Sequence, residues 1–141
     1  MPELLNVVLM IAAALGLFAA CLAFYGRYYI LPALFTGPTI CRLEAGGCQI
    51  LFRTKEAALL GLPNSLLGIL FYPSLAIAAA LRLPDWLLFL ASSASFFMTL
   101  YLARLLISRR LECRICWAGH TANAVIWVVL VARLILDVGG K

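Results

Sequence analysis

Four long apolar stretches constrain the fold of this chain more than any other feature. A helix that spans a bilayer needs about 20 apolar residues, and each stretch runs for about that length before it meets an arginine. The chain is 65% hydrophobic and 12% charged, so a bilayer suits it better than water. Four short strands could not close a barrel, which leaves helices as the spanning elements. The stretches are Leu4–Gly26, Ala57–Leu81, Trp86–Ala103 and Ile115–Ala132.

This pattern predicts an all-α integral membrane protein, built as a bundle of four transmembrane helices. Residues 1–141 would form a single membrane domain, multi-pass in the cell membrane and surrounded by lipid. The first stretch is expected to be a retained helix, because no basic residue precedes it and it exceeds the about 7–15 apolar residues of a signal peptide. The expected spans are 4–30, 57–82, 86–108 and 113–136.

A long loop, residues 31–56, separates the first two expected spans and carries Cys41 and Cys48. Long loops in compact domains are usually functional or disordered, and the two cysteines favour function. An even number of spans puts both chain ends on one side of the membrane. The loop and the turn before Cys113 then share the other side, so Cys41, Cys48, Cys113 and Cys116 can meet at one end of the bundle, here called the cysteine face.

The basic residues predict which way the cysteine face points. Of the 11 lysines and arginines, eight lie near the cysteine face and three near the chain ends, and such residues favour the cytoplasmic side. We therefore predict a cytoplasmic cysteine face, with an extracytoplasmic one as the alternative, since most cytosols keep thiols reduced. No basic run is interleaved with aromatic or polar contact residues, so no nucleic-acid partner is expected. The eight are Arg27, Arg42, Arg53, Lys55, Arg104, Arg109, Arg110 and Arg114, and the three are Arg82, Arg133 and Lys141.

Cys113 and Cys116 form a C-x-x-C pair at the start of the last apolar stretch. A thiolate there lies near the unpaired N–H groups of a helix start, which lower its pKa. The loop cysteines could supply the attacking thiolate for disulfide exchange. Zinc held by the C-x-x-C and C-x6-C pairs together is the alternative. A c-type haem site is excluded, because Trp117 stands where histidine is required.

Two further side chains were weighed on their position in expected helices. Cys21 lies among alanine, leucine and phenylalanine in the first stretch and is expected to be a buried, inert thiol. His120, the only histidine, follows Cys116 by four residues and so shares its helix face. It is either a hydrogen-bonded structural residue or a substrate contact beside the redox sulfur.

Together with the two cysteine pairs, Asn64-Ser65-x-x-Gly68-x-x-Phe71-Tyr72 at the start of the second expected span forms a joint pattern. Over residues 39–127 the chain resembles the vitamin K epoxide reductase family, in its short prokaryotic, archaeal-like form without a fused thioredoxin-like domain. The chain is less similar to DsbB-type proteins, whose C-x-x-C belongs to the first cysteine loop.

The resemblance implies roles for individual residues. Cys113 and Cys116 match the catalytic pair, with Cys116 facing a quinone, and Cys41 and Cys48 match the pair that shuttles electrons from outside. Asn64 matches an asparagine that binds one quinone oxygen. His120 stands where animal members have a tyrosine that binds the other oxygen, and Thr54 falls near a loop hydroxyl of the family. The loop cysteines are one residue closer together than in animal members.

The resulting hypothesis is a quinone-coupled membrane thiol oxidoreductase that generates disulfide bonds. Electrons would pass from a thioredoxin-like dithiol protein in trans through Cys41 and Cys48 to Cys113 and Cys116. The acceptor would be menaquinone, ubiquinone or a related quinone, and no metal is expected. Two alternatives remain: a non-enzymatic membrane zinc-binding or sensor protein that uses the four cysteines as ligands, and a structural bundle whose cysteines only staple the loop.

Overall fold

A computed structural model describes residues 2–29, 55, 58–59, 61–108 and 113–139 of the chain. Four helices account for most of these residues, and the fold is all-helical apart from one two-stranded hairpin of two residues per strand. The elements are α1 (Pro2–Tyr28), β1 (Ala58–Leu59), β2 (Leu62–Pro63), α4 (Asn64–Ala80), α5 (Asp85–Ser108) and α6 (Arg114–Gly139).

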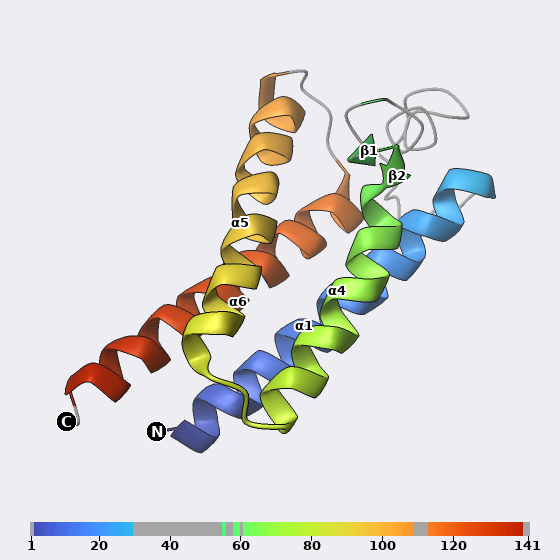
Figure 1. The fold of residues 1–141 in the computed structure, drawn as a ribbon. Helices are drawn as coiled ribbons and strands as arrows, with labels where there is room; N and C mark the ends of the chain where they lie inside the picture. Colours follow the sequence, from blue (N-terminus) through green and yellow to red (C-terminus); the bar gives the residue numbers. More distant parts are fainter. Residues whose placement is uncertain (1, 30–54, 56–57, 60, 109–112, 140–141) are drawn as a thin grey trace.

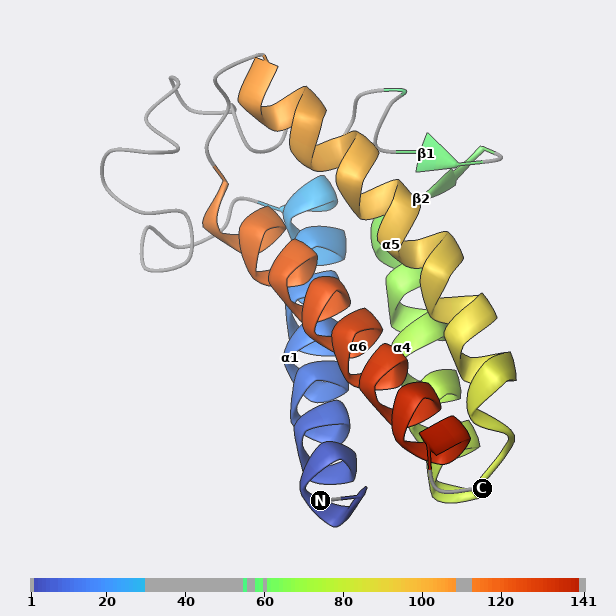
Figure 2. The same ribbon diagram turned by 90° about the vertical axis from the view of Figure 1, so that its left-hand side faces the viewer.

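The four helices form a splayed bundle (Figure 1). Helix α1 packs against α4 and α6, and α5 packs against α6, whereas α4 and α5 approach one another far less. Figure 2 shows α1 and α6 side by side, with the chain ends at the opposite end of the bundle from the hairpin. The end of α1, the hairpin and the start of α6 therefore lie at one end. This is the end at which the sequence predicts the cysteine face.

Helix α4 begins later than predicted. The span was expected from residue 57, whereas Ala58–Leu59 and Leu62–Pro63 pair as two short antiparallel strands, with Leu59 opposite Leu62, and α4 starts at Asn64. Gly61 has a φ of +81°, a conformation that glycine adopts without steric cost. Pro63 is extended, with φ −60° and ψ 134°, and its ring disfavours helix in the residue before it. Pro63 is the N-cap residue, and the helix starts at Asn64.

The outer surface of the bundle is apolar, as a lipid-facing surface must be. Large side chains such as Leu70, Phe97 and Val128 are between 58% and 68% exposed, which water would not tolerate over so large an area. Helices α1, α5 and α6 are long and apolar enough to cross a bilayer. Helix α4 has 17 residues, the lower limit for a span. The membrane prediction is thus supported by three helices of the described part of the chain.

The centre of the bundle is built from small residues on α1. Ala12, Ala13 and Ala20 are buried, and small residues let membrane helices approach closely. At Gly16 the fit is closest, since a Cβ atom there would overlap the ring of Tyr72 on α4. Bulky α1 residues such as Phe18, 55% exposed, point outward instead.

A polar cluster joins three helices at the end of the bundle that holds the chain ends. Arg133 on α6 forms an ion pair with Asp85 at the start of α5, with Nη2 and Oδ1 2.7 Å apart and Nε and Oδ2 3.1 Å apart. Its Nη1 also donates to Asn6 Oδ1 on α1 at 2.9 Å. These contacts hold the ends of α1, α5 and α6 together, opposite the cysteine face.

Candidate active site

Cys113 lies directly before α6 and caps its first turn. Its carbonyl oxygen accepts a hydrogen bond from Trp117 N at 3.0 Å, so the side chain lies beside the N–H groups of the helix start. The thiol is 2% exposed and packs in a small cluster with Ala19 of α1 and with Ile115. Helix α1 therefore covers Cys113 and shields it from the surroundings of the bundle.

The pKa of the Cys113 thiol is lowered, chiefly because the Cys116 side chain hydrogen-bonds to its sulfur. The backbone N–H groups of Cys116 and Ile115 act in the same direction, while burial opposes them. Hydrogen bonds to a charged form favour that form. Cys113 is thus the sulfur of the pair that carries negative charge more readily, a property of a good leaving group in thiol exchange.

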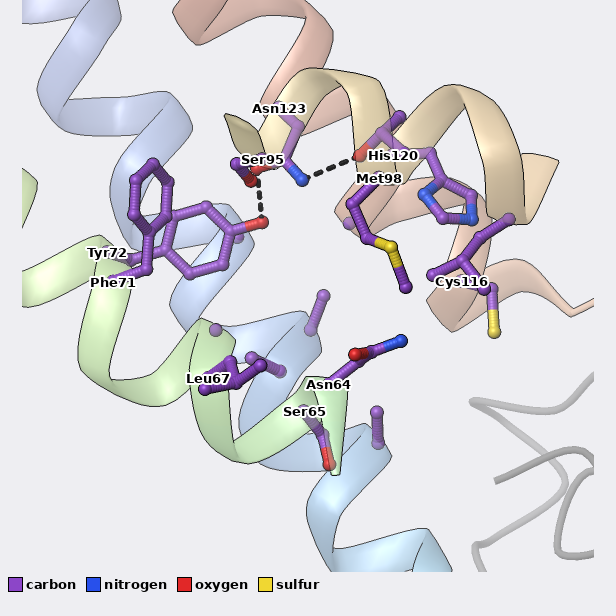
Figure 3. Close-up of a pocket in the computed structure, with 18 of the residues that line it drawn as sticks. Asn64, Ser65, Leu67, Phe71, Tyr72, Ser95, Met98, Cys116, His120 and Asn123 are labelled. Atoms are coloured by element: carbon purple, nitrogen blue, oxygen red, sulfur yellow. Dashed lines mark hydrogen bonds between the residues drawn. The ribbon is translucent and has the colours of Figure 1, made fainter. Parts of the chain in front are cut away.

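A cavity of about 360 Å³ opens beside Cys116, between the four helices. Pockets of this size and apolar character can hold small ligands. Figure 3 shows Asn64 facing Met98, Cys116 and His120 across this space. Most of its lining is apolar, and the polar side chains are few: Asn64, Ser65, Tyr72, Ser95, Thr99, His120 and Asn123.

Asn64 reaches the cavity because of the way in which α4 begins. Pro63 occupies the N-cap position in an extended conformation, so Asn64 is the first helical residue. Its side chain points into the cavity (Figure 3). Because the hairpin occupies the residues before Asn64, α4 begins at this residue, and the position of its amide follows from that start.

His120 lies one helical turn beyond Cys116 on α6 and lines the same cavity. Its ring meets the ring of Trp117 edge-on, with centroids 6.0 Å apart, which limits its rotation. Gly119 also lines the cavity, and a Cβ atom added there would lie 3.9 Å from Cβ of Ala19 on α1. Cys116, His120 and Asn64 therefore surround one apolar space with a thiol, an imidazole and an amide.

Three polar residues of the cavity received no role from sequence reasoning. Tyr72 Oη donates to Asn123 Oδ1 at 2.8 Å, and Asn123 Nδ2 donates to Thr99 Oγ1 at 2.7 Å (Figure 3). One signal was present: Asn123 follows Cys116 by seven residues, which places a polar side chain on the same helix face. Tyr72 belongs to the family pattern, but nothing in the sequence links it to Asn123.

The structure brings together four of the predicted site residues. Asn64, Cys116 and His120 line the cavity, and Cys113 contacts Cys116 from behind it. Cys41, Cys48 and Thr54 lie outside the described residues. The zinc alternative needs Cys41 and Cys48, and among the residues that the structure describes no group of three or more histidine, cysteine or acidic side chains could hold a metal.

The prediction for Cys21 is wrong. This thiol is exposed on the outer surface of α1, on the side that carries Phe18 one turn earlier. The first stretch is apolar all round, so its sequence does not show which side faces the bundle. In a membrane, small residues take the helix interfaces, and here Gly16, Ala19 and Ala20 do so.

This geometry agrees with what a comparison with protein families finds. Residues 7–131 match the profile of the vitamin K epoxide reductase family. The match includes all of α4 and α5, most of α1 and α6, and both cysteines of the C-x-x-C pair. Searches of curated proteins and of solved structures found no match.

Proposed function

Because this chain belongs to the vitamin K epoxide reductase family, and is thereby a membrane thiol oxidoreductase that works with a quinone, we propose that it generates disulfide bonds. In this proposal a dithiol protein is the electron donor, and a membrane quinone is the acceptor. The two cysteine pairs carry the electrons between them.

One observation carries the proposal: Cys116, Asn64 and His120 line the same cavity. Its remaining walls are mainly alanine, leucine and other apolar side chains. An apolar ring bearing carbonyl oxygens suits such a space, because the two polar side chains can donate to its oxygens. Donors aimed at an oxygen that gains negative charge lower the barrier of the step.

The first half of the proposed reaction moves two electrons from the partner to the C-x-x-C pair. A dithiol partner reduces the Cys41–Cys48 disulfide by exchange and leaves as a disulfide. The Cys48 thiolate then attacks Cys113 and breaks its bond to Cys116. Cys41 attacks Cys48 in the mixed disulfide and releases Cys113 as the leaving thiolate. The hydrogen bond that lowers the pKa of Cys113 favours this release.

The second half regenerates the oxidised pair. Cys113 and Cys116 re-form their disulfide, with Cys116 as the sulfur that faces the substrate. The two electrons and two protons that they lose convert the quinone to its hydroquinone. In total, two partner thiols and one quinone become one disulfide and one hydroquinone. Thr54, as a loop hydroxyl, is proposed to assist the relay on the cysteine face.

The finer features of the proposal follow from the sequence. A thioredoxin-like protein in trans is proposed as the donor, and menaquinone, ubiquinone or a related quinone as the acceptor.

The excess of basic residues favours a cytoplasmic cysteine face. A membrane-impermeant thiol reagent applied to intact cells should then leave Cys41 and Cys48 unlabelled after reduction. Labelling before the cells are opened would instead assign the face to the exterior.

The proposed function is tested by mixing purified protein in detergent with dithiothreitol and a short-chain quinone. The loss of the quinone's ultraviolet absorbance, above the rate of direct chemical reduction, measures turnover. No turnover with benzoquinones or naphthoquinones would contradict the proposal. Disulfide formation in a thioredoxin-like substrate, coupled to quinone consumption in a one-to-one ratio, would support its direction.

Replacement of Asn64 by leucine is expected to lower kcat for quinone reduction by about 10²-fold, because loss of one preorganised donor has this size of effect. Ser74→Ala is the matched control on α4, since Ser74 is exposed and bonds only to the Leu70 carbonyl of its own helix. It should retain wild-type turnover. If Asn64→Leu is as active as Ser74→Ala, the amide does not contact the reacting oxygen.

A further inference from the structure

The hydrogen-bonded series Tyr72–Asn123–Thr99 is a buried polar bridge between three helices. Tyr72 belongs to α4, Asn123 to α6 and Thr99 to α5, and their two hydrogen bonds are 2.8 and 2.7 Å long. Tyr72 is 5% exposed and Thr99 is 6% exposed. In hydrocarbon, polar groups favour hydrogen bonds across helices. These two bonds therefore restrict the positions of α4, α5 and α6 relative to one another.

The bridge lies directly beside the reactive groups. Asn123 follows His120 by three residues and Cys116 by seven, and all three line the cavity. Tyr72 lies two helical turns beyond Asn64 on α4. The bridge therefore connects the wall that carries Asn64 with the wall that carries Cys116 and His120.

The bridge links α4 to α5 through α6, well away from the turn at residues 81–84 that joins the two helices. The two helices have little direct contact, while each packs against a different neighbour, α1 or α6. The side chain of Asn123 reaches both, because its carbonyl accepts from α4 and its amide donates to α5. The ring of Tyr72 cannot retreat toward α1, since it already fills the space over Gly16.

We propose that Asn123 is a positioning residue of the quinone site. From α6 it bonds to Tyr72 on α4 and to Thr99 on α5, and these two bonds fix the distance between α4 and α5. It thereby keeps the Asn64 amide across the cavity from Cys116 and His120. This inference rests on the proposed function for its kinetic consequence. The geometric consequence, the separation of α4 and α5, is independent of that function.

The kinetic test separates the two halves of the reaction in Asn123→Leu, which removes both hydrogen bonds at similar volume. Pre-reduced protein is mixed with a short-chain quinone in a single turnover, and oxidised protein is separately reduced by dithiothreitol without quinone. Misplacement of reacting groups by about 1 Å can cost about 10²-fold in rate. We expect the quinone step to slow by about tenfold to a hundredfold and the thiol step to stay within twofold.

Ser93→Ala is the matched control. It removes another hydrogen bond between α5 and α6, from Trp127 Nε1 to Ser93 Oγ at 3.1 Å, and neither residue lines the cavity. Its quinone step should remain within twofold of wild type. Equal slowing of both halves in Asn123→Leu, or equal slowing of the quinone step in the control, would assign Asn123 a merely structural role and overturn the proposal.

Three milder changes keep the test decisive if Asn123→Leu does not fold. Tyr72→Phe and Thr99→Val each remove one partner of the bridge, and Gly16→Ala displaces the Tyr72 ring without removing a polar group. Each should slow the quinone step alone. Because residues of one network act together, Tyr72→Phe and Thr99→Val combined should cost less than the product of their separate effects. A full product would mean that the residues act separately.

A distance measurement distinguishes failure of this inference from failure of the proposed function. Spin labels at the exposed positions Leu70 on α4 and Phe97 on α5, in a background without native cysteines, report the helix separation. The distance distribution should broaden or lengthen in Asn123→Leu and not in Ser93→Ala. An unchanged distribution overturns the positioning role, even where quinone turnover is present. A changed distribution with no quinone turnover in the native chain places the failure in the proposed function.

Discussion

Replacement of Cys116 by serine is expected to abolish quinone reduction completely. Cys116 carries the only thiol among the described residues that line the cavity, and a hydroxyl cannot form the disulfide that remains after the two electrons are lost. Cys113→Ala should have the same effect, since it removes the other half of that bond. The measurement is quinone consumption with dithiothreitol as donor, against the rate without protein.

Cys21→Ser is the control for this experiment. Cys21 is exposed on the outside of α1 and does not line the cavity, so its loss should leave turnover unchanged. Thiol labelling of the reduced protein would show that Cys113→Ala and Cys116→Ser each retain one reactive thiol of the pair, and a wild-type circular dichroism spectrum would show that they are folded. Substantial quinone reduction by Cys116→Ser would place the electron donor elsewhere and remove the basis of the mechanism.

Cys48→Ala and Cys41→Ala are expected to stop oxidation of a protein partner while leaving reduction by dithiothreitol intact. A small dithiol can attack the Cys113–Cys116 disulfide itself, whereas a folded partner needs the loop pair to carry electrons to it. The measurement compares both donors in each variant, with quinone consumption as the common readout. A loss of at least about 10²-fold with the partner is expected, because no direct exchange path remains for it.

The two loop variants should differ in what they trap. In Cys41→Ala, Cys48 can still form the mixed disulfide with Cys113, which non-reducing mass spectrometry would detect as a cross-link. In Cys48→Ala this cross-link should be absent. If both variants oxidise the partner at the wild-type rate, the relay is wrong and the C-x-x-C pair meets its partner directly.

Much of the fold was predictable because hydropathy is a local property. Apolar stretches that end at Arg27, Arg82, Arg104 and Arg133 predicted four helices, and the described residues contain four long helices, three of them long and apolar enough to cross a bilayer. The boundary of α4 was not predicted, since a glycine and a proline within an uncharged stretch do not change its hydropathy. Gly61 has a positive φ and Pro63 is extended, so neither residue is helical, and α4 begins at Asn64 instead of at residue 57.

The candidate site was predictable where its residues share one helix. Cys116 and His120 are four residues apart, and that spacing places them together without knowledge of any other helix. Their relation to Asn64 came only from the family resemblance, because more than 50 residues separate Asn64 from Cys116 in the chain. The rotation of α1 was unpredictable from an evenly apolar sequence, which is why Cys21 was expected on the wrong side.

The sequence by itself therefore determined that this is a membrane protein, where its apolar helices lie, that a C-x-x-C pair stands at the start of α6, and the family. Only the tertiary structure decided which small residues of α1 face inward, how far α4 and α5 stand apart, and that Tyr72, Asn123 and Thr99 bond to one another. The physical reason is the distance along the chain over which each property acts. Apolar length and residue spacing act within one helix, whereas a cavity and a bridge depend on how separate helices rotate and pack in three dimensions.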